Sequence, residues 1–216
     1  MESLLNASNI DIAVSKLINK YHNAKYYLNF NSPNELLVCV MLSPQTKDET
    51  INKITPKLFS KYKTLKDFSN ADPDELINYV RNVNFAKNKI KNIINASKII
   101  VNEYNGKIPN NIDQLLNLPG IGRKSAISIL INAYNIIEGI PVDTWVIKLS
   151  FRIGLSLSKN PDKIEADLEK IIDKKYWGKI SYVLKQHGKE TCKSVPICSK
   201  CIINDLCKKN NVVKSL

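Results

Sequence analysis

The sequence predicts an all-α protein. Apolar residues recur at helical spacing, alternating strand patterns of four or more residues are scarce, and only seven glycines interrupt the 216 residues. Regular apolar spacing with few turn residues is typical of packed helices. We therefore expect helices throughout, joined by short connections.

The clearest helix is expected over residues 87–104. Its apolar side chains fall on one face of a 3.6-residue repeat, which indicates a stripe that packs into the core. The stripe consists of Ile90, Ile93, Ile94, Ile100, Val101 and Tyr104.

Two further helices are marked by their first residues. Asp72 is followed by Pro73 and, three residues after the cap, by Glu75. Asn160 and Pro161 repeat the arrangement. An Asx cap followed by proline at the first helical position predicts a helix start at each place.

Length and hydropathy bound the class of protein. A chain with 44% hydrophobic residues can bury one large or two small cores. The first residues lack the basic and apolar segments of a signal peptide, and no stretch approaches 18 uninterrupted apolar residues. We expect a soluble intracellular protein of the cytoplasm and nucleoid, or of the nucleus in a eukaryote, with no membrane partner.

The charge is strongly positive. Lys and Arg outnumber Asp and Glu by 32 to 20, for a net charge of +12. Such an excess favours a polyanionic partner, with nucleic acid as the first candidate. A genome rich in A and T also supplies Lys, Asn and Ile, so charge alone leaves the partner open.

Four of the five cysteines crowd into the last 25 residues. They are Cys192, Cys198, Cys201 and Cys207, separated by five, two and five residues. Clustered thiols in an intracellular protein usually hold metal, and both a zinc ion and a four-iron four-sulfur cluster take four cysteines. Only Cys198 and Cys201 have the close spacing of a zinc knuckle, which favours the cluster and leaves zinc as the alternative. The fifth, Cys39, lies in an apolar run and is expected to be a buried small hydrophobe.

A glycine turn joins two helical patterns at LNLPGIGRKSA, residues 116–126. Gly120 and Gly122 permit backbone angles and close approaches that side chains forbid. The amides that open the second helix then face outward and can bind a phosphate without reading sequence. An ordinary turn between helices would use the same residues.

Lys124 falls in the first turn of that second helix. The positive end of the helix disfavours an ammonium there, and a partly desolvated lysine with a lowered pKa is an amine nucleophile. Asp143 follows nineteen residues later, after a helix over 125–134 and a turn over 138–141. It could bring a carboxylate to the same pocket, or act only as the N-cap of the next helix.

These motifs together resemble the endonuclease III family of helix-hairpin-helix glycosylases with an iron-sulfur cluster. The resemblance is carried by LPGIGRKSA, by PVDTWV over residues 141–146, by the four C-terminal cysteines and by LSPQTKD over residues 42–48. It covers most of the chain from about residue 30. Three features depart from the family pattern: the first cysteine spacing is five residues instead of six, Trp145 stands where a histidine is usual, and the residues around Phe85 lack the usual glycine and tyrosine.

The resemblance implies a role for each matching residue. Lys124 and Asp143 match the catalytic lysine and aspartate, and Gln45 matches the residue that fills the gap left by the extruded base. Phe85 falls where the family places an apolar wedge, and the four cysteines match the ligands of a [4Fe-4S] cluster. The further expected DNA contacts are Lys47, Leu118, Gly120, Gly122, Arg123 and Lys148.

The implied architecture is two helical lobes with a helix-hairpin-helix motif, a C-terminal four-cysteine cluster loop over 192–207 and an active-site cleft between the lobes. One domain is expected over residues 25–134. The other is discontinuous, over 1–24 and 135–216.

The implied activity is that of a monomeric DNA repair glycosylase with AP lyase activity. It would excise oxidised pyrimidines from duplex DNA through a lysine Schiff base and β-elimination, and would also act on abasic sites. The alternatives are a mismatch-specific or monofunctional glycosylase that uses water, whose members generally lack the lysine, and a non-catalytic DNA-binding protein.

Overall fold

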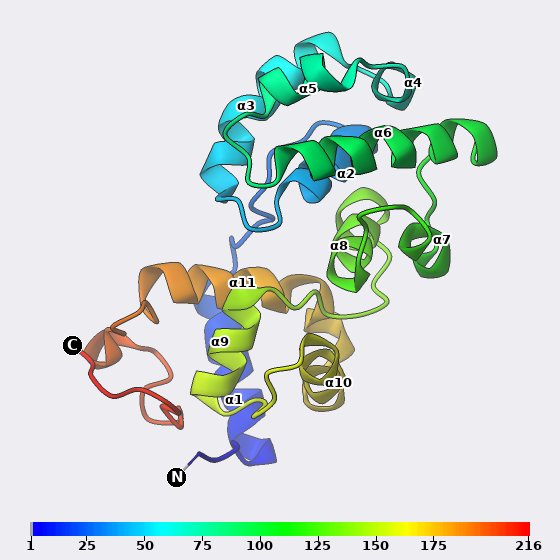
Figure 1. Cartoon of the computed structure of the whole chain (residues 1–216). Coiled ribbons are helices and arrows are strands. Elements are labelled where there is room, and N and C mark those ends of the chain that lie inside the picture. The colour runs from blue at the N-terminus through cyan, green and yellow to red at the C-terminus, as the bar shows by residue number, and fades with distance from the viewer. Residues whose placement is uncertain (1) are drawn as a thin grey trace. The chain divides into compact units, whose positions relative to one another are not determined.

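Every regular element of the described chain is a helix. The computed structural model describes residues 2–216, and within them the chain forms eleven α-helices and two short 3-10 helices with no strand (Figure 1). The all-α prediction is confirmed. The chain separates into two compact units, residues 26–138 and residues 1–25 with 139–216.

The unit of residues 26–138 is built around a buried helix. It contains α2 (Pro33–Leu42), α3 (Asp48–Lys61), α4 (Leu65–Ser69), α5 (Pro73–Tyr79), α6 (Ala86–Glu103), α7 (Ile112–Leu116) and α8 (Arg123–Tyr134). All residues from Leu36 to Leu42 are buried, and α2 packs against α6 and α8. Cys39 is fully buried among them, as expected, and burial raises the pKa of its thiol to about 12.

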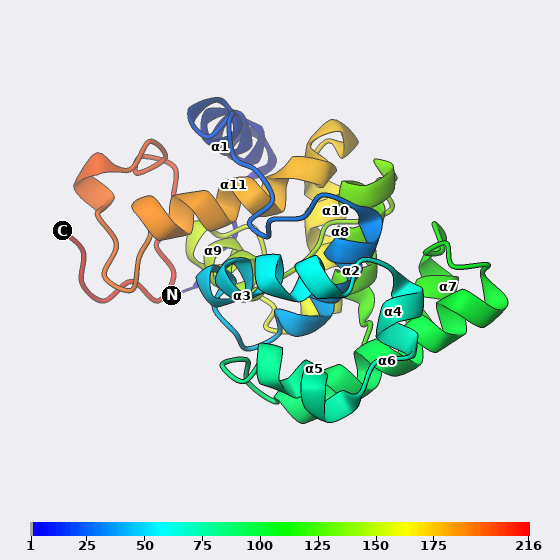
Figure 2. The ribbon, with the colours of Figure 1, turned by 90° about the horizontal axis from the view of Figure 1, so that it is seen from above.

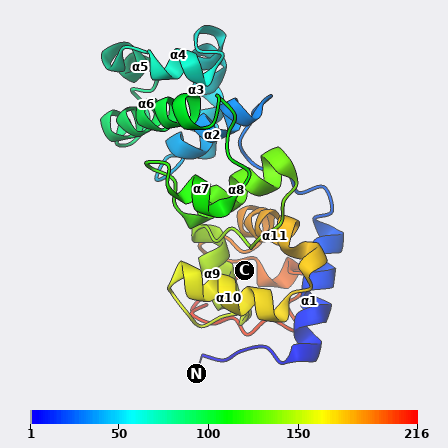
Figure 3. The same cartoon turned by 90° about the vertical axis from the view of Figure 1, so that its right-hand side faces the viewer.

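Helix α6 carries the predicted apolar stripe. Ile90, Ile93, Ile94 and Ile100 are buried, whereas Val101 and Tyr104 are only partly covered at the edge of the core. Helices α4 and α5 pack on α6, as Figure 3 shows. The stripe therefore ties the helices of this unit together.

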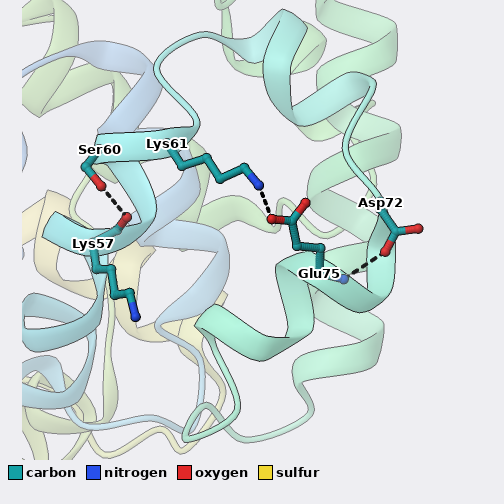
Figure 4. A network of polar contacts seen from close by, with 5 residues as sticks. All are labelled: Lys57, Ser60, Lys61, Asp72 and Glu75. Atoms are coloured by element: carbon teal, nitrogen blue, oxygen red, sulfur yellow. Dashed lines mark hydrogen bonds and ion pairs between the residues drawn. The ribbon is translucent and has the colours of Figure 1, made fainter.

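Helix α5 begins at the predicted cap. The Asp72 carboxylate accepts a hydrogen bond of 2.8 Å from the backbone N–H of Glu75, and Pro73 occupies the first turn. The Glu75 carboxylate in turn forms an ion pair with Lys61 of α3 (Figure 4). These contacts fix where α5 starts.

The second unit joins the two ends of the chain. It contains α1 (Ala7–Lys20), α9 (Thr144–Ile153), α10 (Pro161–Ile171), η1 (Lys174–Tyr176), α11 (Trp177–Glu190) and η2 (Cys198–Lys200). Helix α11 packs against α1 and α9 (Figure 2), and Asn160 caps α10 as predicted. Near the termini, the backbone N–H of Ser3 donates to the side-chain carbonyl of Asn210 at 3.1 Å. Among the described helices, none has the length and apolar character needed to cross a membrane.

Candidate nucleic-acid site and cysteine centre

The glycine turn connects α7 to α8 over residues 117–122. Gly120 has φ +83°, and a Cβ atom there would lie 2.8 Å from the amide nitrogen of the Asn92 side chain. Gly122 caps α8 with φ −100°, and a Cβ there would meet nothing within 4 Å. Gly120 is therefore required by the backbone and by Asn92, whereas the space at Gly122 leaves the first amides of α8 accessible.

The hairpin side chains differ in exposure. Leu118 is 2% exposed and belongs to the core of residues 26–138, and its backbone N–H and carbonyl are bonded to Leu115 and Ile121 within the turn. Arg123, the first residue of α8, is exposed.

Lys124 is half-buried in the first turn of α8, as predicted. Its ammonium group donates a hydrogen bond of 2.9 Å to the Tyr27 hydroxyl and lies 5.6 Å from the centre of that ring. The Tyr27 ring packs against Tyr26, with 4.6 Å between ring centroids. Tyr27 thus sets the direction of the lysine amine.

Sequence reasoning missed Tyr27. It precedes Lys124 by 97 residues, and the only local signal is an aromatic pair. Such a pair is more often part of a hydrophobic core than of a polar site.

Asp143 is the N-cap of α9. Its Oδ1 atom accepts hydrogen bonds of 2.9 Å from the backbone N–H groups of Trp145 and Val146. Both hydrogen bonds are accepted by Oδ1, so capping uses only one of the two carboxylate oxygens. Asp143 belongs to the unit of residues 139–216, and Lys124 to the unit of residues 26–138.

Trp145 follows the cap and packs against α11. Lys148, one turn further along α9, places its ammonium 4.9 Å from the centre of the indole ring. Burial lowers the pKa of Lys148, and the nearby Arg152 guanidinium lowers it further.

The segments that carry Gln45 and Phe85 both adopt left-handed backbone. Gln45 has φ +56° and is exposed, and Phe85 has φ +57° with 63% of its side chain exposed. Lys47, at the N-cap of α3, is also exposed. An exposed phenylalanine in strained backbone contributes nothing to the core, which points to a function at the surface.

All four C-terminal cysteines line a single small cavity of about 20 Å³. Arg152 organises the loop beside it by donating to the backbone carbonyls of Lys193 and Ser194 at 2.5 and 3.0 Å. Its Nη1 atom also lies 3.6 Å from the Cys192 sulfur. His187 is buried, with Nε2 3.7 Å from the Cys201 sulfur and Nδ1 3.1 Å from the Tyr21 hydroxyl.

The four thiols line this cavity without forming a ready-made metal site among the described residues. Within residues 2–216, no group of three or more His, Cys, Asp and Glu side chains is arranged to hold a single metal ion. Burial raises the pKa of the Cys207 thiol to about 11 and also raises that of Cys201. Thiols that resist ionisation need a strong positive charge to become ligands.

Comparison with known proteins defines the class. Residues 38–174 match the family described as HhH-GPD superfamily base excision DNA repair protein. The match spans the glycine hairpin, Lys124 and Asp143. The helical fold and the hairpin therefore define a protein of this base excision repair superfamily.

Relatives narrow the class to one family. The chain is 37% identical to endonuclease III of Synechocystis, covering 93% of this chain and 91% of the relative, and 33% identical to endonuclease III of Bacillus subtilis, covering 95% and 94%. The structure of a trapped endonuclease III-DNA covalent intermediate superposes with a TM-score of 0.91 at 32% identity, over 95% of this chain and 97% of that one. The chain belongs to the endonuclease III family, which confirms the resemblance seen in its motifs.

A more distant neighbour shares the fold alone. The structure of a thermostable thymine-DNA glycosylase superposes with a TM-score of 0.83 at 19% identity, over 94% of this chain and 96% of that one.

Proposed function

We propose that this protein is a DNA N-glycosylase with AP lyase activity that removes oxidised pyrimidines from duplex DNA. The observation that carries the proposal is Lys124. Its amine lies in the first turn of α8, directly after the glycine hairpin, and is oriented by the Tyr27 hydroxyl at 2.9 Å. A lysine in that position, in a chain of the endonuclease III family, supports a Schiff-base enzyme over a glycosylase that uses water.

DNA binding begins with the phosphate backbone. The net charge of +12 favours association with duplex DNA, and the accessible amides that follow Gly122 suit a phosphate oxygen. Leu118 would support this turn from the core, and Gly120 supplies its left-handed backbone. Arg123, Lys47 and Lys148 add positive side chains, of which Lys148 is the most covered.

Gln45 and Phe85 are proposed to act on the bases. Rotating the damaged nucleotide out of the duplex costs a few kcal/mol, and damage that weakens stacking reduces this cost. The exposed Gln45 side chain would occupy the gap, and the exposed Phe85 ring would lie against the opposite strand.

The chemistry then proceeds through Lys124. Its neutral amine forms a bond to the sugar C1′ atom while the bond from C1′ to the base breaks, and the electron pair and a proton leave with the base. The Asp143 carboxylate stabilises the positive charge that develops on the sugar, accepts the proton released by the amine and passes it to the departing base.

Ring opening then leaves an imine between Lys124 and C1′. The imine makes the C2′ hydrogen acidic. Loss of that proton forms a carbon-carbon double bond and expels the 3′ phosphate, which is the lyase step. Water finally releases the sugar remnant from the lysine.

The cysteine centre is proposed to hold a [4Fe-4S] cluster on Cys192, Cys198, Cys201 and Cys207. A zinc ion needs four ligands at about 2.0–2.3 Å from one centre, an arrangement that the described side chains do not form. The cysteine spacing and the endonuclease III family favour the cluster, which also takes four cysteines. When bound, the cluster would tie residues 192–207 into one rigid loop. The thiols are its ligands, and Arg152 holds the backbone of that loop.

Trp145 is proposed to affect which lesions are accepted. It stands beside the Asp143 cap and replaces a smaller residue of the family pattern, so it alters the space next to the carboxylate. The change affects base selection rather than the chemical steps.

Borohydride trapping tests the proposal. The protein is incubated with a duplex that carries one thymine glycol, or with an abasic duplex, and borohydride reduces any imine to a stable amine. We expect covalent adducts with both duplexes, and none with Lys124→Ala. The exposed α6 lysine variant Lys98→Ala serves as control. Adduct on the abasic duplex alone would retain the lyase and reject thymine glycol as substrate, and no adduct on either duplex would reject the Schiff-base mechanism.

A further inference from the structure

Lys89 is a buried lysine that the proposed chemistry does not use. It lies on α6 and is 8% exposed. Its ammonium donates to the backbone carbonyls of Leu42 and Pro44 at 2.7 and 2.5 Å and to the Thr46 hydroxyl at 3.3 Å. A desolvated ammonium is stable in a fold only when such acceptors surround it.

All three acceptors belong to the segment that presents Gln45. Residues 42–47 run from the last residue of α2 to the start of α3, and Gln45 takes left-handed backbone with φ +56° at the tip. A non-glycine residue in that conformation is costly and persists only when its surroundings hold it. The bonds from Lys89 fall on both sides of Gln45 and provide that restraint.

Asn84 links the same segment to Phe85. The Asn84 side-chain amide donates to the backbone carbonyl of Gln45, and its backbone N–H donates to the Thr46 hydroxyl at 3.2 Å. The Thr46 hydroxyl thus accepts from both Lys89 and Asn84. Phe85, the next residue, also has left-handed backbone.

We propose that Lys89, acting with Asn84 and Thr46, is a positioning residue that holds the Gln45 and Phe85 segments in one fixed arrangement for opening the damaged base pair. This inference rests on the proposed function. Both side chains must enter the duplex together, and segments whose backbone is already held in place lose less conformational entropy when they enter. The gain applies to extruding a damaged base, which an abasic site no longer requires.

The inference predicts a difference between two substrates. Lys89→Met keeps the buried aliphatic stem and removes the three donated bonds. We expect base release from thymine glycol under single turnover to slow by about tenfold or more, the equivalent of ~1.4 kcal/mol in the barrier. Borohydride trapping at a preformed abasic site should change by less than about threefold, or ~0.7 kcal/mol.

A second variant guards against misfolding. Asn84 is exposed, so Asn84→Ala should fold, and it removes the bond to the Gln45 carbonyl. We expect the same selective loss on thymine glycol. Lys98→Met, an exposed lysine change on the same helix, is the matched control and should behave as wild type on both substrates.

A fluorescent base gives a readout that a purely structural role would not alter. 2-Aminopurine placed opposite thymine glycol brightens when its partner leaves the stack and the gap is filled. We expect this rise to be smaller in Lys89→Met and Asn84→Ala at matched unfolding temperature and DNA saturation. Equal brightening in all variants, or an equal loss of rate on both substrates in folded variants, would overturn the inference. If wild type forms no adduct on the abasic duplex, the proposed function itself fails, which is a different result.

Discussion

Gly188 of α11 lies against the indole of Trp145 from α9, so closely that a Cβ atom on Gly188 would be 2.3 Å from the Trp145 Cε3 atom. A contact this short cannot persist with any other residue at position 188. The glycine therefore makes room for the tryptophan that stands beside the Asp143 cap.

Gly188→Ala should consequently destabilise the protein. Overpacking of this kind typically costs about 1–3 kcal/mol, measured here as the free energy of unfolding in urea. In the Trp145→Ala background the added methyl group has space, so the same glycine change should cost much less. Equal costs in both backgrounds would show that the contact does not limit stability.

Tyr27→Phe should slow adduct formation at an abasic site. The change keeps the ring beside Tyr26 and removes the hydroxyl that accepts from the Lys124 amine. Without this hydrogen bond the Lys124 amine is no longer held in one direction for attack, so we expect a loss of about tenfold in the trapping rate, or ~1.4 kcal/mol in the barrier. Tyr79→Phe, which alters a tyrosine packed against Tyr62, should leave the rate unchanged.

The protein purified without oxygen should contain iron and acid-labile sulfide in equal amounts. Cys201→Ala removes one thiol from the cavity and should lower both together, and Arg152→Met should lower them by loosening the backbone of residues 193–194. Elemental analysis decides between an iron-sulfur cluster and a zinc ion. One zinc per chain, with no iron, would reject the cluster.

The pH dependence of stability should show the titration of the buried Lys89 amine. Burial lowers the pKa of Lys89 to about 8, below the ordinary value of 10.5. Between those values the unfolded chain binds a proton that the folded chain has released, so stability rises with pH across this window relative to Lys89→Met. The penalty for burying the ammonium is fully present below pH 8. Urea unfolding of wild type and Lys89→Met at several pH values measures the difference in their free energies of unfolding. A difference that does not change with pH would show that the Lys89 amine is solvated.

The cap of α5 offers a test of local structure (Figure 4). Asp72→Ala removes the acceptor for the Glu75 N–H and should cost about 1 kcal/mol in the free energy of unfolding. Glu75→Gln breaks the ion pair with Lys61 and should cost less, because both partners are exposed. A larger loss of unfolding free energy for Glu75→Gln than for Asp72→Ala would contradict this prediction.

Sequence alone determined the helical class, the helix starts at Asp72 and Asn160, and the stripe on α6, because caps and 3.6-residue spacing are local properties. It also determined the family, because the hairpin, Lys124, the Asp143 segment and the cysteines each form a short motif in a fixed order. The roles given to those site residues stay predictions.

Tertiary structure alone decided which partners those motifs have. Tyr27 reaches Lys124 across 97 residues, Lys89 reaches residues 42–46, and Gly188 accommodates Trp145. None of these contacts has a periodicity or spacing that marks it in the sequence. They arise from how separate helices pack, and the energy of a buried amine or a crowded indole depends on neighbours that only packing supplies.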